Sequence, residues 1–190
     1  AKGMGASVIV TGIDPIKAME AAMDGFRVMP MREAAPLGDL FVTLTGCADV
    51  ICAEYMERMK DGVLLANSGH FDVEINKSDL ERLSVESWER KPNIRGYRMR
   101  DGRVLNLLAE GRLVNLAAGN GHPAEIMDLS FALQAKGLEY LAAHGASLPP
   151  RVYAVPAEID RAVAEQKLAA MHVEIDRLTT EQQAYLARVE

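Results

Sequence analysis

Short apolar runs alternate with helix-like stretches over the first two thirds of the chain. The runs are rich in aliphatic residues and lack polar alternation, a pattern typical of parallel strands that are covered on both faces. Asp14 can cap a helix that follows the first run, and Pro15 suits the first turn of that helix. The strands predicted in this way are 7–11, 27–29, 40–44 and 63–67, and the helices between them are 15–23 and 49–59. This order predicts an α/β fold with a doubly wound, Rossmann-like parallel sheet.

The pattern changes in the middle of the chain. Residues 86–91 and 94–99 have strand-like alternation, and Asp101-Gly102 is a hairpin signal that leads into residues 104–108. We therefore expect a small antiparallel excursion after the parallel strands.

The last third of the chain is helical. Helices are predicted over 123–144 and 157–171, and Thr179 with Gln182 three residues later forms a capping-box pattern that opens a third helix. The boundary falls near Gly121, which predicts two domains, 1–121 and 122–190.

Composition and charge narrow the function classes. The chain has 190 residues, 49% hydrophobic and 25% charged, as in globular proteins, and its net charge of −6 argues against nucleic-acid binding. No apolar run is long enough for a membrane span and no secretion signal is visible, so we expect a cytoplasmic protein. Cys47 and Cys52 fit neither a complete zinc site nor a disulfide framework, and we predict a reduced pair and no metal site.

The first residues do not resemble a natural beginning. Residues 1–5 lack an initiator methionine and are typical of the last turn of a helix with Gly5 as its cap. We therefore expect the chain to be a C-terminal piece of a longer protein.

Candidate chemistry lies at the carboxyl ends of the predicted strands, where doubly wound sheets bind ligands. Small residues follow one strand in Thr45-Gly46-Cys47-Ala48-Asp49, and a glycine beside a histidine follows the next in Asn67-Ser68-Gly69-His70-Phe71-Asp72. A third candidate is Thr11–Pro15, after the first strand. Each has a plain structural alternative: a helix start at Thr11–Pro15, a small packed side chain at Cys47, and a partner for a backbone carbonyl at His70. No GxGxxG, P-loop, HExxH or GxSxG motif occurs, so the local patterns indicate only a nucleotide-type α/β domain.

Several longer segments resemble the S-adenosyl-L-homocysteine hydrolases, or adenosylhomocysteinases, in a consistent order from Ala1 to about Tyr185. They are GASVIVTGIDPIKAMEAAMDGFRVMPM, DLFVTLTGCADVI, MKDGVLLANSGHFDVEI, LLAEGRLVNLAAGNGHPAEIMDLSF and LTTEQQAYL. The resemblance implies a tightly held NAD that oxidises the ribose 3′-hydroxyl of S-adenosylhomocysteine. The ketone acidifies the 4′ C–H, homocysteine leaves, water adds, and the stored NADH reduces the product to adenosine.

The resemblance also implies roles for particular residues. His70 would be the catalytic, substrate-side group, Asn115 would hydrogen-bond the nicotinamide carboxamide, and His122 would lie at the mouth of the adenosine site beside a hinge. The cofactor-binding residues implied in this way are Cys47, Ser68, Gly69, His70, Asn115 and His122. Residues 122–190 would supply the hinge helix and an oligomerisation segment, in a homotetramer or homodimer.

The chain departs from the family pattern in three respects. It stops at Glu190 without the lysine-and-tyrosine tail that reaches a neighbour's NAD in many members, so we expect no cofactor contact by such a tail. Gly12 occupies the place of a glutamate that grips the adenine-ribose hydroxyls, which suggests a relaxed choice between NAD and NADP. The resemblance also places the first strand of the sheet, its Gly-rich loop and the catalytic lysine and aspartates upstream of Ala1. We therefore expect the segment alone to be inactive. Two alternatives stay open: a hydrolase of S-inosylhomocysteine, and a non-catalytic NAD-binding regulator.

Overall fold

The chain divides into two units in the computed structural model, which describes residues 1–188. The first unit is Ala1–Gly121 and the second begins at His122. Residues 189 and 190, which end the predicted second domain, lie outside the described residues.

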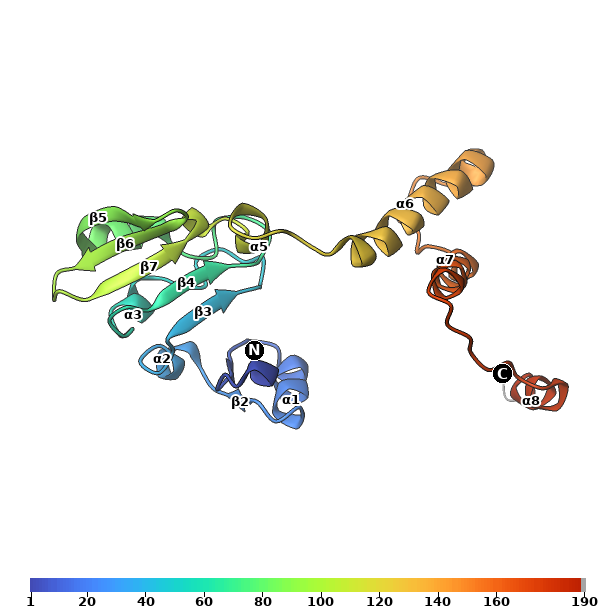
Figure 1. Cartoon of the computed structure of the whole chain (residues 1–190), viewed down its shortest axis with the longest axis horizontal. Coiled ribbons are helices and arrows are strands. Elements are labelled where there is room, and N and C mark those ends of the chain that lie inside the picture. The colour runs from blue at the N-terminus through green and yellow to red at the C-terminus, as the bar shows by residue number, and fades with distance from the viewer. Residues whose placement is uncertain (189–190) are drawn as a thin grey trace. The chain divides into compact units, whose positions relative to one another are not determined.

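A five-stranded mixed sheet forms the body of the first unit (Figure 1). Its strands lie in the order β3-β4-β7-β6-β5, with β3, β4 and β7 parallel and β6 and β5 antiparallel to their neighbours. The expected α/β class is confirmed. The strands are β3 (Leu40–Thr43), β4 (Leu64–Asn67), β5 (Ser84–Lys91), β6 (Ile94–Met99) and β7 (Val104–Leu108).

A separate two-stranded parallel sheet precedes this body. It pairs β1 (Ile9–Val10) with β2 (Arg27–Val28), and the helix α1 (Pro15–Met23) connects them. The predicted cap is confirmed, because the Asp14 carboxylate accepts hydrogen bonds from the first-turn N–H groups and Pro15 is the first helical residue. Within residues 1–188, β3 pairs with β4 only, so its other edge has no strand partner. The described strands of the first unit thus form two separate sheets.

Two sequence-based expectations were wrong in detail, and a third, the antiparallel excursion, is confirmed but incomplete. The helix expected over 49–59 is only α3 (Ala53–Met56), because Asp49 has a left-handed φ of 57° and Ile51 forms a parallel bridge with Ile75. The strand over residues 104–108 belongs to more than an antiparallel excursion, since β7 also pairs parallel with β4 in the middle of the sheet. Finally, β3 is not covered on both faces, because Leu40 and Val42 are about half exposed.

The core of the first unit lies between the sheet and short helices on one side of it. These helices are α2 (Met31–Ala34), α3 and α4 (Lys77–Leu83), of which α4 was not predicted. The Asn76 side chain caps α4 by accepting a hydrogen bond from the Asp79 N–H. The fully buried apolar side chains that meet here include Ile51, Met56, Met59, Leu65, Ile75, Leu80, Leu105 and Leu107.

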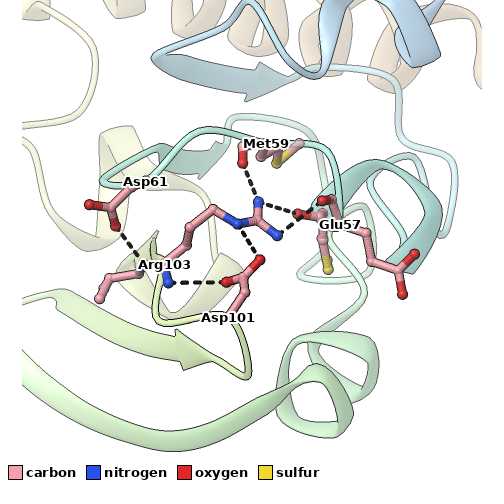
Figure 2. A network of polar contacts seen from close by, with 7 residues as sticks. Glu57, Met59, Asp61, Asp101 and Arg103 are labelled. Atoms are coloured by element: carbon pink, nitrogen blue, oxygen red, sulfur yellow. Dashed lines mark hydrogen bonds and ion pairs between the residues drawn. The ribbon is translucent and has the colours of Figure 1, made fainter.

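A polar network fixes the amino ends of β4 and β7 (Figure 2). The Arg103 guanidinium donates hydrogen bonds to the main-chain carbonyls of Met59 and Glu57 and pairs with the Asp101 carboxylate at 2.7 Å. The Asp61 carboxylate accepts a hydrogen bond from the Val104 N–H at 2.7 Å. One arginine therefore satisfies two main-chain carbonyls in the turn that follows the short helix α3.

The second unit consists of helices. They are α6 (Ala124–His144), the 3-10 turn η3 (Gly145–Ser147), α7 (Ala157–Ala170) and α8 (Thr180–Leu186). The predicted capping box of Thr179 and Gln182 is confirmed at the start of α8. No apolar residue of α6 is buried within the described chain, and Ile126 and Leu138 are more than half exposed. In residues 1–188 we find no helix that combines the length and the apolar character a bilayer span requires.

Candidate functional site

The carboxyl ends of β3, β4 and β7 meet at one edge of the sheet, because the three strands are parallel neighbours. The buried side chain of Asn67, the last residue of β4, joins the loops that follow them. Its Oδ1 accepts hydrogen bonds from the Gly69 N–H at 2.7 Å and from the Thr43 hydroxyl at 3.3 Å. Its Nδ2 donates to the carbonyls of Phe71 at 2.7 Å and Gly111 at 2.8 Å. Both polar atoms of its side chain are satisfied, and they join the end of β3 to the segments that follow β4 and β7.

A second buried polar residue, Glu74, joins the loop after β3 to the segment after β4. Its carboxylate accepts hydrogen bonds from the N–H groups of Thr45 (2.9 Å) and Gly46 (2.7 Å) and from the Thr45 hydroxyl (3.1 Å). Burial acts to raise the pKa of Glu74, but these hydrogen bonds outweigh burial and hold the pKa below its usual value. The carboxylate is therefore ionised at neutral pH.

Two glycines permit this arrangement. Gly46 has a φ of 72°, in the left-handed region that glycine adopts without strain, and this turn aims its N–H at Glu74. Gly69 lies so close to Glu74 that a Cβ on it would stand 1.5 Å from the carboxylate Oε1. A side chain at position 69 and the carboxylate at 74 cannot occupy this place together.

The predicted site residues of these two loops lie at the same edge of the sheet. Cys47 is exposed and its N–H donates to the Thr45 hydroxyl at 3.0 Å. Ser68 is half-buried and its N–H donates to the Thr43 carbonyl at 2.8 Å. The His70 imidazole is exposed and packs edge-on against the Phe71 ring, with 4.1 Å between centroids. The imidazole is thus free to meet a ligand at this edge.

Asn115 follows the third strand, on the short helix α5 (Val114–Ala117). The chain reaches α5 through Leu113, which forms a parallel bridge with Asn67. The side-chain oxygen of Asn115 is buried, and it is the one buried side-chain polar atom within residues 1–188 that has no hydrogen-bond partner. Buried amide oxygens almost always accept a hydrogen bond, so this oxygen is available to accept one from a bound ligand.

The last predicted site residue, His122, opens the second unit and is exposed there. In the part of the chain that the structure describes, no group of three His, Cys, Asp or Glu side chains could hold a metal ion.

Sequence reasoning placed Asn67 in a candidate segment but missed its role in joining the strand ends, and it missed Glu74 altogether. The available signal was weak: Glu74 is a charged residue between the apolar residues Val73 and Ile75, in a stretch that also contains Asp72 and Lys77. A charge at such a position is paired or hydrogen-bonded when it is buried, but the partner cannot be read from the spacing.

Comparisons with known proteins agree with the earlier resemblance. Residues 1–121 match the family model described as S-adenosyl-L-homocysteine hydrolase, NAD binding domain. The chain is 61% identical to an adenosylhomocysteinase of Thermococcus kodakarensis over 98% of its own length and 44% of that protein's. It is 58% identical to an adenosylhomocysteinase of Aquifex aeolicus over 98% of the chain and 45% of the relative. It is also 58% identical to an S-inosyl-L-homocysteine hydrolase of Methanopyrus kandleri, over 98% of the chain and 44% of the relative. The chain thus spans less than half the length of these relatives.

Proposed function

We propose that the chain is the NAD-binding portion of an adenosylhomocysteinase. It belongs to the S-adenosyl-L-homocysteine hydrolase family and carries that family's NAD-binding domain. The whole enzyme would hydrolyse S-adenosyl-L-homocysteine to adenosine and L-homocysteine. When bound, NAD supplies a transient oxidation of the substrate ribose that is reversed before product release.

The unpaired oxygen of Asn115 carries this proposal. The carboxamide of a nicotinamide ring offers N–H donors, and a buried acceptor without a partner fits such a group. Holding the carboxamide fixes which face of the ring meets the substrate, so the orientation matters more than the energy of one hydrogen bond.

The loops beside Asn115 supply the other contacts that we propose. Ser68 and Gly69 would approach the cofactor with their main chain, because both are only half-buried at the strand ends. The exposed imidazole of His70 would face the substrate ribose, where it can hold or move a proton. Cys47 would contact the adenosine end of NAD through its backbone, and His122 would lie at the mouth of the substrate site.

An Asn115→Ala variant of the intact protein tests the proposal. Its oxygen forms no hydrogen bond within residues 1–188, so truncation should leave the thermal midpoint nearly unchanged. The affinity for NAD, measured by calorimetry on protein freed of cofactor, should fall about tenfold, the worth of one buried hydrogen bond. Wild-type NAD affinity in this variant would contradict the assignment of Asn115.

The nucleobase that the substrate carries needs a separate test. Relatives with 58% identity are named for adenosine-bearing and for inosine-bearing substrates. We propose the adenine-bearing substrate. Release of adenosine from S-adenosylhomocysteine and of inosine from S-inosylhomocysteine, measured side by side with the intact protein, distinguishes the two. Release of neither product, with NAD still bound, would favour a non-catalytic NAD-binding regulator.

Three further proposals follow from the family. The segment alone would be inactive, because the resemblance implies that the Gly-rich pyrophosphate loop and the catalytic lysine and aspartates are supplied by the rest of the enzyme, so that His70 could not act alone. The whole protein would be cytoplasmic and act in one-carbon metabolism. It would form a homodimer or homotetramer, and the exposed apolar residues of α6 suit burial against another subunit.

A further inference from the structure

Glu74 is a fully buried carboxylate that has no cationic partner within residues 1–188. A buried charge without a counterion is unfavourable unless hydrogen bonds replace the water that it loses. All three hydrogen bonds that its carboxylate accepts come from Thr45 and Gly46. The charge is therefore stabilised by a single loop, the one that follows β3.

The main chain beside Glu74 contacts the same loop. The Val73 carbonyl accepts a hydrogen bond from the Asp49 N–H at 2.9 Å, and the Glu74 carbonyl accepts one from the Ile51 N–H at 3.0 Å. Side chain and main chain together thus fix the loop from Thr45 to Ile51. Strand pairing alone would not do this, because the ladder between β3 and β4 ends at Thr43 and Asn67.

The loop after β4 also contacts this carboxylate, at the Oε1 that accepts the hydrogen bond from the Gly46 N–H. The Glu74 Oε1 leaves no room for a side chain at Gly69. The backbone conformation itself does not require glycine there, because the φ of Gly69 lies outside the left-handed region. Without the carboxylate, the nearest neighbour of a Cβ at position 69 would be the Asn67 Oδ1 at 3.1 Å, so the carboxylate is the main obstacle to alanine there. Glycine at 69 and glutamate at 74 form one steric unit.

We propose that Glu74, together with Gly69, is a positioning device that sets the loops bearing Cys47 and His70 at one fixed separation for the cofactor. This inference rests on the proposed function, since it takes these loops to contact NAD. Glu74 itself touches no reacting atom. It acts through the main chain of Thr45, Gly46 and Gly69.

A Glu74→Gln variant of the intact protein tests the hydrogen-bonding part. Glutamine keeps the shape, but its NH₂ group cannot accept, so one of the two main-chain donors loses its partner. We expect the Kd for NAD, measured by calorimetry on cofactor-free protein, to rise about 10- to 100-fold. The matched control is Asp61→Asn, which alters a carboxylate that accepts a main-chain N–H at the amino ends of the strands. This control should keep the wild-type Kd.

A double-mutant cycle tests the steric part. Gly69→Ala should weaken NAD binding strongly when Glu74 is present, and should have little further effect in a Glu74→Ala background, so the two changes are coupled by more than tenfold. Equal NAD affinity of Glu74→Gln and Asp61→Asn, or additive effects of Gly69→Ala and Glu74→Ala, would overturn the inference while leaving NAD binding by the wild type intact. Absence of NAD binding by the wild type would instead overturn the proposed function, and this inference with it.

Discussion

Replacing Arg103 by alanine should loosen the amino ends of β4 and β7 and leave the cofactor loops unaffected. The guanidinium donates to the carbonyls of Met59 and Glu57 and to the Asp101 carboxylate, and the side chain is only 24% exposed. Removing a charged donor from main-chain acceptors costs about 1.5–3 kcal/mol per bond, and water replaces part of it here. We therefore expect a local loss of about 2–4 kcal/mol.

Amide hydrogen exchange followed by mass spectrometry measures this loss directly in the intact protein. A local loss of that size corresponds to exchange that is about 30- to 700-fold faster in peptides spanning residues 57–63. Arg103→Lys should give an intermediate effect, because one ammonium group cannot reach two carbonyls and a carboxylate as the planar guanidinium does.

Arg98→Ala is the matched control. Arg98 pairs with Glu86 at 3.1 Å, but both side chains are about half exposed, so the pair contributes at most about 1 kcal/mol. Because the Arg103 network lies at the amino ends of the strands, the Kd for NAD should stay at the wild-type value in both variants. Equal protection of residues 57–63 in the two variants, or weaker NAD binding by Arg103→Ala, would refute the reasoning.

Three further outcomes are expected. Gly12→Glu should raise the NAD affinity of the intact protein by up to about a hundredfold and lower the affinity for NADP. A Cβ on Gly12 would meet nothing within 4 Å, and a carboxylate there can accept hydrogen bonds from two ribose hydroxyls. An unchanged ratio of the two Kd values would contradict this. Asn67→Asp should lower the thermal midpoint markedly, at a cost of about 3 kcal/mol or more, since a buried carboxylate would face the carbonyls of Phe71 and Gly111; a wild-type midpoint would count against it. Because the pKa of Glu74 is lowered in the folded state, its ionised carboxylate stabilises the fold fully above the usual pKa of 4.5. This stabilisation is lost as the pH falls through the lower folded pKa. Exchange protection of Thr45 and Gly46 should therefore hold down to pH 4.5 and decline only below it. Protection that changes between pH 7 and 5 would contradict that sign.

Local signals in the sequence predicted much of the fold. The Asp14 cap, the capping box of Thr179 and Gln182, and the apolar cores of β3 and β4 depend on neighbours within a few residues, and the structure contains all of them. Elements that depend on distant partners were predicted less well. The helix expected from residue 49 fails because Ile51 pairs with Ile75 instead, a contact that no local pattern encodes.

The candidate site shows the same division. Its position followed from the rule that ligands bind at the carboxyl ends of parallel strands, and Ser68, Gly69 and His70 lie there. The side chains that hold the loops could not be predicted, because Glu74 is 28 or 29 residues away from the N–H groups that it accepts from. Asn67 likewise reaches Gly111 across 44 residues. Such partnerships exist only after the chain has folded.

The unpaired edge of β3 bears on how a chain of this length behaves in solution. This edge presents main-chain N–H and C=O groups without a strand partner in residues 1–188, beside the exposed apolar side chains of Leu40 and Val42. Another extended polypeptide can pair with such an edge. Concentrated samples of these residues alone would therefore be drawn into intermolecular β-assemblies that begin at this edge. A short peptide that pairs with this edge would block such assembly and keep the chain in solution.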